Sequence, residues 1–138
     1  MLGTGADPRY KLTPVQVSGL TGVTRVSAGA EHSMALTSAG VVWTWGHNND
    51  GQLGDGTLTS RSKPVRVTGV AGVVEIGNGR LHSLAIESDG SAWAWGLNST
   101  GQLGDGTTTN RRAPVKIPGI SGAFGVGGGV NYSVVLHT

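Results

Sequence analysis

The stretch GQLGDGT occurs twice in this chain of 138 residues, at Gly51–Thr57 and again at Gly101–Thr107. The sequence around it repeats too: residues 23–72 and 73–122 align without a gap and are identical at 24 of 50 positions. Such a strict period indicates one supersecondary unit that is used several times. The stretch therefore predicts a repeat protein and leaves open what each unit folds into.

Each unit has the pattern of four short β-strands. In the first unit the expected strands are Val23–Gly29, His32–Ser38, Val41–Gly46 and Pro64–Val67. Alternating apolar residues and β-branched or aromatic side chains favour strands, and no stretch shows the 3.6-residue period of a helix. Ala39-Gly40 predicts a two-residue hairpin. Pro64 at the start of the last strand suits an outer edge, because proline has no N–H to donate to a ladder.

Four antiparallel strands in a unit of about 50 residues are typical of a β-propeller blade, so the expected fold class is all-β. The predicted organisation is a single repeat domain, 1–138, with the end of a preceding blade (1–22), repeat 1 (23–72), repeat 2 (73–122) and a partial repeat 3 (123–138). Propellers close with roughly 4–8 blades, whereas these segments predict eleven strands. We therefore expect an incomplete ring in one chain. Head-to-tail association of identical chains or further blades of a larger propeller would complete it.

Two motifs in each repeat resemble a known family. They are GAEHSMAL at Gly29–Leu36 with VWTWGHNNDGQLGDGT at Val42–Thr57, and their second copies at Gly79–Ile86 and Ala92–Thr107. These are similar to RCC1-type repeats, from the regulator of chromosome condensation family. The resemblance covers almost the whole chain and implies a propeller that binds other proteins. A third copy, GGVNYSVVL at Gly128–Leu136, has Tyr132 where the family pattern has histidine.

The resemblance leaves several functions open, because proteins of this family include guanine nucleotide exchange factors, photoreceptors and a secreted β-lactamase inhibitor. We expect a non-catalytic protein-binding or scaffold module, with nucleotide exchange or a pure assembly role as alternatives. Exchange by the family's namesake uses an insertion in an irregular blade, and the gapless repeats contain none. No nucleophile motif or pair of catalytic carboxylates is present, so the chain is not expected to be an enzyme.

The histidines of the motif recur at one position of the repeat. A structural role within the blade is favoured for His32 and His82, with each imidazole bonded to backbone of its own blade, because a catalytic residue is rarely repeated. By resemblance, some family members place such histidines near a central funnel. His32, His82 and Tyr132 are therefore also candidate binding residues.

The glycine-rich loops are expected to be structural, since repeated turns need the positive φ that glycine adopts freely. The predicted structural residues, which include one tryptophan and one inter-blade leucine per repeat, are Gly46, Gly51, Leu53, Gly54, Gly96, Gly101, Leu103, Gly104, Trp45 and Trp95. LGTG at Leu2–Gly5 looks like a worn copy of LGDG. Calcium binding by Asn48, Asn49, Asp50 and Asp55 is disfavoured because the EF-hand spacing is absent, so neither a metal nor a cofactor is expected.

Basic residues cluster at one position of the repeat, around the entry to the fourth strand. Eight of the ten lie there: Arg9, Lys11, Arg61, Lys63, Arg66, Arg111, Arg112 and Lys116. Charges on outer strands block edge-to-edge pairing, and the same cluster could bind an acidic protein. Nucleic acid is disfavoured because the net charge is only +2 and no aromatic stacking surface accompanies the cations.

Composition excludes two further classes of protein. The chain contains no cysteine, so disulfide frameworks and thiolate metal sites are impossible. It has neither the apolar run of a membrane span nor the basic start and apolar core of a signal peptide, so no membrane partner is expected. The compartment stays undetermined.

Overall fold

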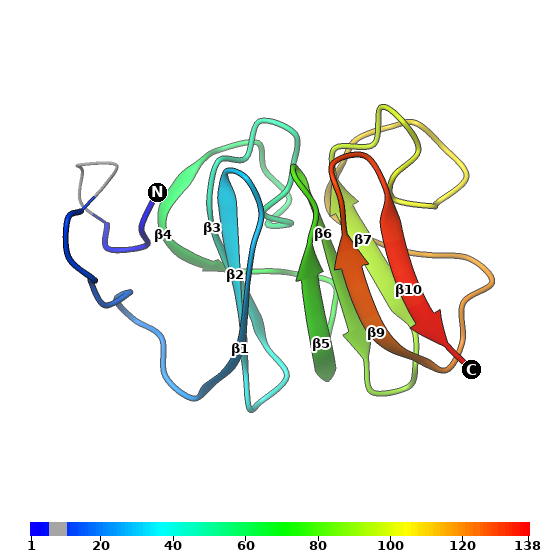
Figure 1. Ribbon diagram of the computed structural model, residues 1–138, viewed down its shortest axis with the longest axis horizontal. Coiled ribbons are helices and arrows are strands. Elements are labelled where there is room, and N and C mark those ends of the chain that lie inside the picture. The colour runs from blue at the N-terminus through cyan, green and yellow to red at the C-terminus, as the bar shows by residue number, and fades with distance from the viewer. Residues whose placement is uncertain (6–10) are drawn as a thin grey trace.

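The computed structural model describes residues 1–5 and 11–138, and this part of the chain forms ten β-strands and no helix. The strands pair into three antiparallel sheets that stand side by side in chain order (Figure 1). The described ranges also hold no helix of the length and apolarity needed to cross a bilayer.

Two complete sheets follow one plan, and we call each sheet a blade. Blade 1 consists of β1 (Val23–Ala28), β2 (His32–Thr37), β3 (Val42–Gly46) and β4 (Arg61–Arg66). Blade 2 consists of β5 (Val73–Asn78), β6 (His82–Glu87), β7 (Ala92–Gly96) and β8 (Arg111–Lys116). Blade 3 has two strands in the described residues, β9 (Ala123–Gly128) and β10 (Ser133–His137). The propeller blades expected from the sequence are confirmed.

The strand connections differ from the predictions in two details. The turn between β2 and β3 is longer than a two-residue hairpin: Gly40 donates its N–H to the Thr37 carbonyl, and the Thr37 N–H reaches the Val41 carbonyl. Gly40 has a φ of +74°, as expected for a turn that ends in a glycine bulge. The fourth strand starts at Arg61, so Pro64 lies inside β4 and not at its first position. An outer strand tolerates this because one side of it has no ladder partner.

The core lies between blades, and blade 2 in the middle buries both faces of its sheet. One apolar cluster joins blades 1 and 2, and a second joins blades 2 and 3. Successive residues of a strand point to opposite faces, so one strand serves two interfaces. On β6, Ala85 belongs to the first cluster, whereas Leu84 and Ile86 belong to the second.

The stretch before β1 corrects one prediction. The sequence predicted the last strand of a preceding blade within residues 1–22, but residues 11–22 form no strand. In blades 1 and 2 the outer strand pairs with the third strand of its own sheet, and no strand of the described residues takes that position beside residues 11–22. LGTG nevertheless lies where the sequence placed it: Gly3 sits against Trp45 as Gly54 sits against Trp95.

Candidate interaction surface

A chain of hydrogen bonds joins each blade to the next through the repeated histidine. Nε2 of His32 on β2 lies 2.8 Å from Oγ of Ser83 on β6, and Ser83 donates to the Gln52 carbonyl at 2.8 Å. The same carbonyl accepts from Trp95 Nε1 at 3.0 Å. His82, Ser133 and the Gln102 carbonyl repeat the arrangement between blades 2 and 3. The histidine therefore links neighbouring blades.

This linkage corrects the expectation that each imidazole bonds backbone of its own blade. Both imidazoles use Nε2 toward a serine of the following blade, and neither Nδ1 has a partner within the described residues. The side chains are buried, with His32 at 3% and His82 at 0% exposure. Burial, with a smaller contribution from His82, lowers the pKa of His32 to about 4, and burial also lowers the pKa of His82. Both imidazoles are neutral at physiological pH, and partners inside the protein occupy their Nε2 atoms.

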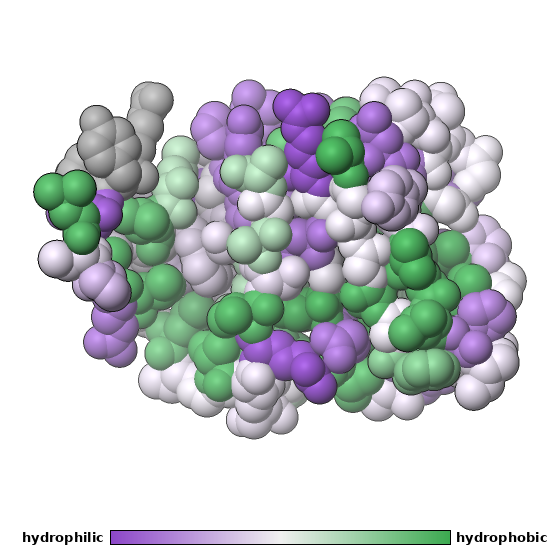
Figure 2. All heavy atoms as spheres, viewed as in Figure 1, coloured by the Kyte–Doolittle hydropathy of each residue, from purple (hydrophilic) through white to green (hydrophobic). Residues whose placement is uncertain are grey.

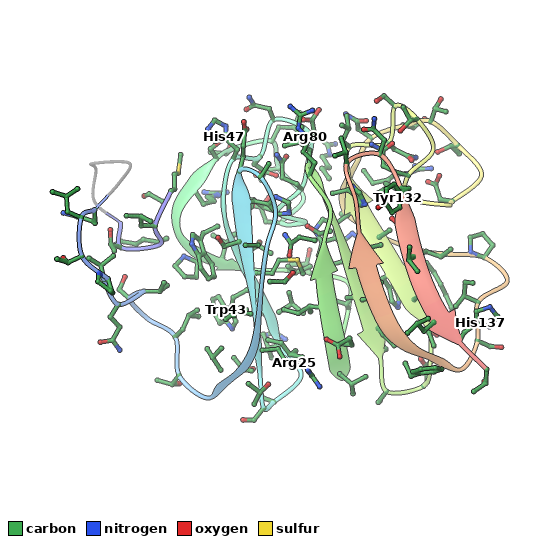
Figure 3. All side chains as sticks on the ribbon, viewed as in Figure 1. Arg25, Trp43, His47, Arg80, Tyr132 and His137 are labelled. Carbon is green, nitrogen blue, oxygen red and sulfur yellow. The ribbon has the colours of Figure 1, made fainter. Side chains whose placement is uncertain are left out.

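Tyr132 replaces the third histidine and lies at the surface. Its ring covers Gly129 in the way that the His82 ring covers Gly79, so both side chains leave the backbone in the same direction. Tyr132 is 63% exposed, just before β10 (Figure 3). Of the three predicted binding residues at this position of the repeat, only Tyr132 is accessible.

The repeated tryptophan and the GQLG loop form an inter-blade contact. Trp95 is fully buried, and a methyl group on Gly54 would come within 2.6 Å of its Nε1. Gly51 of the same loop lies against the backbone of Arg112 on β8, and Gly56 donates its N–H to the Arg112 carbonyl. The loop of blade 1 thus rests on blade 2, and Leu53 and Leu103 are completely buried.

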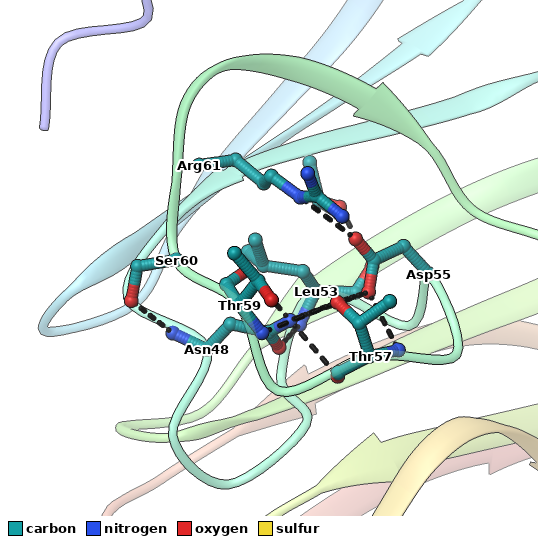
Figure 4. A network of polar contacts seen from close by, with 8 residues as sticks. Asn48, Leu53, Asp55, Thr57, Thr59, Ser60 and Arg61 are labelled. Carbon is teal, nitrogen blue, oxygen red and sulfur yellow. Dashed lines mark hydrogen bonds and ion pairs between the residues drawn. The ribbon is translucent and has the colours of Figure 1, made fainter.

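A buried asparagine organises the interior of each long loop (Figure 4). Nδ2 of Asn48 donates to the carbonyls of Thr57 and Thr59, and its Oδ1 accepts the Leu53 N–H. Asp55 accepts from Thr57 and from Nε of Arg61 at 3.1 Å. Asn98 and Asp105 repeat the pattern in blade 2.

These loop carboxylates are held ionised by protein groups. Burial alone would raise the pKa of Asp105, but hydrogen bonds from Thr107, Arg111 and Asn98 lower it to about 2. The pKa of Asp55 is also lowered, against the effect of burial, by Thr57 and Arg61. The described residues contain no group of three or more His, Cys, Asp or Glu side chains that could hold a metal ion.

Asn48, predicted only as a disfavoured calcium ligand, instead holds the loop together, a role that was not predicted from the sequence. The sequence did contain a signal for this role, because an asparagine, an aspartate, a threonine and an arginine recur at equivalent positions of both long loops. Ser83 and Ser133 were likewise not recognised as the inter-blade partners of the histidines.

The predicted basic residues divide into two groups. Arg61 and Arg111 are half-buried and form ion pairs with Asp55 and Asp105. Five others are exposed, and no carboxylate of the described residues lies within ion-pair distance of them: Lys11, Lys63, Arg66, Arg112 and Lys116. Arg9 lies outside the described residues. Within the described part of the chain, each of the outer strands β4 and β8 therefore carries two cations without a carboxylate partner.

Each outer strand also places a cation beside a tryptophan. Arg66 on β4 is the register partner of Trp43 on β3, and Lys116 on β8 is the partner of Trp93 on β7. Directly opposed residues of an antiparallel pair project from the same face of the sheet. Trp43 and Trp93 are half-buried, so both blades have an aromatic and a basic residue together near the outer edge.

Comparison with known families identifies the repeat. The model of the regulator of chromosome condensation (RCC1) repeat matches residues 1–36, 39–86 and 89–136. The chain belongs to the RCC1 repeat family. Each of the last two matches crosses a blade boundary: residues 39–86 contain β3 and β4 of blade 1 with β5 and β6 of blade 2. The RCC1 unit is thus a pair of half-blades from neighbouring blades. The histidine joins one unit to the next, because His32 lies in the first match and its partner Ser83 lies in the second.

The relatives are longer proteins that contain similar repeats. The chain is 44% identical over 61 residues to the human E3 ubiquitin-protein ligase HERC2, which covers 43% of this chain and 1% of HERC2. It is 38% identical over 68 residues to RUG3, a mitochondrial RCC1 domain-containing protein of Arabidopsis thaliana, covering 41% of this chain and 15% of RUG3. The chain therefore spans a small part of these curated relatives.

Solved RCC1 structures confirm the propeller fold. Human WBSCR16 superposes with a TM-score of 0.74 at 30% identity, over 83% of this chain and 30% of that one. Prp20p of Saccharomyces cerevisiae superposes with a TM-score of 0.75 at 22% identity, over 82% and 30% respectively. The structure of Prp20p was described together with its binding properties to Gsp1p and histones.

Proposed function

We propose that the chain is a non-catalytic protein-binding module that binds an acidic protein along its outer strands. The observation that carries the proposal is the set of four cations, two on β4 and two on β8, that have no ion-pair partner among the described residues. Rigid antiparallel sheets hold these side chains, and Asp55 and Asp105 neutralise only the neighbouring Arg61 and Arg111. A surface of this kind attracts an acidic partner and raises its association rate.

Binding to a defined acidic probe tests this surface. The probe is a fluorescein-labelled peptide of ten glutamates, with a ten-residue Gly-Ser peptide as its control. The variant Lys63→Glu/Arg66→Glu/Arg112→Glu/Lys116→Glu should lose binding. Arg25→Gln/Arg80→Gln removes two cations outside β4 and β8 and should keep it. Equal binding by both variants would overturn the proposal, as would stronger binding to a duplex DNA of similar charge.

We also propose that the 138-residue chain associates with itself, head to tail. Apolar side chains are exposed at both ends of the row of blades, at Val26 on β1 and at Val134 and Leu136 on β10. The space-filling view shows hydrophobic atoms over β9 and β10 and between the N-terminal stretch and β1 (Figure 2). Light scattering over a dilution series tests this: we expect a dimer or trimer mass, and a 14 kDa particle at all concentrations would contradict it.

A further inference from the structure

The two internal interfaces of the molecule use equivalent residues. We call the side of a blade that meets the following blade its forward face, and the opposite side its rear face. Between blades 1 and 2 the forward face contributes Met34, Leu36, Val42 and Val67, and the rear face contributes Val73, Ile76, Ala85 and Trp95. Between blades 2 and 3 the equivalents, 50 residues later, include Leu84, Ile86 and Ile117 facing Ala123, Val126 and Val135. One packing pattern therefore serves both junctions.

Blade 3 has a forward face that no described residue of the chain covers. The residues equivalent to Met34 and Leu36 are Val134 and Leu136, and they are 50% and 55% exposed. Their counterparts Met34, Leu36, Leu84 and Ile86 are buried. Val134 and Leu136 thus have the positions of interface residues without an interface.

Blade 1 has the matching open rear face. A groove of about 480 Å³ runs along it, lined by Val23, Val26, Ala35 and Trp45. The first three correspond to Val73, Ile76 and Ala85, and Trp45 corresponds to Trp95, so the groove has the residues that receive a forward face.

The N-terminal stretch supplies one further part of this receiving site. Val17 lines the groove and lies beside Gly3, as Ile117 lies beside Gly104. It therefore takes the place that Val67 and Ile117 take directly after the outer strands β4 and β8. The components of the groove are those of an inter-blade junction in which the described residues lack the first three strands of the preceding blade. A β9–β10 hairpin would supply the first two of these strands.

We infer that a second copy of this chain fills the groove with its β9–β10 hairpin, placing Val134 and Leu136 against Val26 and Trp45. This inference rests on the self-association proposed above and specifies its surfaces and register. The repeat of 50 residues also brings Tyr132 of one copy to Ser33 of the next, because His32 meets Ser83 and His82 meets Ser133. Ser33 lines the groove. Inside the chain, Arg25 of blade 1 pairs with Glu75 of blade 2. At the proposed contact, Gly125 of one copy takes the place of Arg25, and Arg25 of the next copy takes the place of Glu75. Two like charges therefore do not meet at this position.

Cysteine cross-linking tests the register, because the natural chain has no cysteine. Val26→Cys and Val134→Cys are made as separate proteins and mixed under mild oxidation, with Leu58→Cys on the exposed long loop as the control. A heterologous contact joins different patches of the two copies. We therefore expect covalent dimers from the Val26→Cys and Val134→Cys mixture, and none from either protein alone or from mixtures with Leu58→Cys.

A second variant tests the same contact without cross-linking. Val134→Arg/Leu136→Arg should reduce the mass in light scattering to that of one chain while the far-ultraviolet circular dichroism spectrum is kept. Leu58→Arg should leave the oligomer intact. If the double arginine variant is still oligomeric, or if Val26→Cys forms covalent dimers with itself, the inferred register is wrong. Self-association of the chain would still hold in either case. A monomeric unmodified chain overturns both, and further blades of a longer chain would then be the occupants of these faces.

Discussion

At the scale of single residues, the chemistry of this protein is concentrated in side chains that join one blade to the next. His32 is the clearest case, because it is buried and its imidazole reaches across to Ser83. A charged imidazole in this place would lose its hydration without gaining a carboxylate, since its close polar neighbours are Ser83 and the Asn78 amide. The residue therefore makes stability depend on pH.

We predict that the free energy of unfolding falls as the pH drops from about 6.5 to about 4. In this window the unfolded chain takes up a proton on His32, whereas the folded chain does not until the pH approaches its lowered pKa of about 4. His32 accounts for a decrease of about 3 kcal/mol in the free energy of unfolding, and this decrease is complete below pH 4. Urea unfolding at pH 7.5, 5.5 and 4.5 measures it.

The matching variants separate this effect from general acid sensitivity. His32→Gln should flatten much of the slope, with His82 responsible for what remains, because its pKa is lowered too. Asn49→Ala, which changes an exposed residue without removing a titratable group, should keep the slope of the unmodified chain. Identical slopes in all three proteins would contradict the assignment.

Two glycines of the GQLGDG loop offer a second prediction at this scale. Gly54 and Gly56 both have positive φ, +69° and +82°, so alanine costs about 1 kcal/mol of backbone strain at either position. At Gly54 the new methyl group would also meet Trp95 Nε1 at 2.6 Å, whereas at Gly56 it meets open space. Displacing a buried tryptophan adds about 2 kcal/mol. We expect Gly54→Ala to lower the urea midpoint clearly more than Gly56→Ala does. Equal midpoints would show that Trp95 can move away from the new methyl group without a cost in stability.

At the scale of elements, the long loop between the third and fourth strands behaves as a folded unit. Asn48 is completely buried, and its amide group holds three segments of the loop through Leu53, Thr57 and Thr59. Because these hydrogen bonds fix its conformation, the loop presents one defined surface to the neighbouring blade. This explains how an irregular segment can take part in the contact with Trp95.

We predict that Asn48→Ala destabilises the protein by about 3 kcal/mol, because it leaves the buried Leu53 N–H and two partly buried carbonyls without their partner. Asn49→Ala, at the exposed neighbouring position, should change the unfolding free energy by less than about 0.5 kcal/mol. Chemical unfolding measures both. A small effect at Asn48 would mean that water replaces its amide in the loop.

How much of these elements the sequence could predict follows from where their partners lie. Strands such as β2 and β3 were predictable because alternation and tryptophan spacing are local signals. The start of β4 was placed three residues late, since Pro64 resembles a strand start and the pairing of Arg61 with Gly46 is not visible in a linear pattern. The strand expected at the end of a preceding blade is absent from residues 11–22, because the third strand with which it would pair is not among the described residues. The serine that meets His32 is 51 residues away, so only the packing of two blades shows the contact.

At the scale of the whole molecule, blades contact only their neighbours, so an uncovered blade lacks half of its packing. Blade 2 is covered on both faces. Blades 1 and 3 each leave one face open, with Val26 and Leu136 among the exposed residues. Whatever covers these faces must contribute to the stability of the fold, since burial of apolar surface is the main favourable contribution to folding.

This dependence yields a prediction for thermal unfolding of the 138-residue chain. If copies cover each other's open faces, association and folding are linked, and the midpoint must rise with protein concentration. We expect a rise of about 5 °C between 2 µM and 200 µM, by calorimetry or circular dichroism. Val134→Arg/Leu136→Arg should give a lower midpoint that does not change with concentration, because its forward face no longer fits the groove of the next copy. A midpoint of the unmodified chain that is equal at both concentrations would show that its blades are stable without a neighbour, and that the apolar faces at the two ends are not joined in solution.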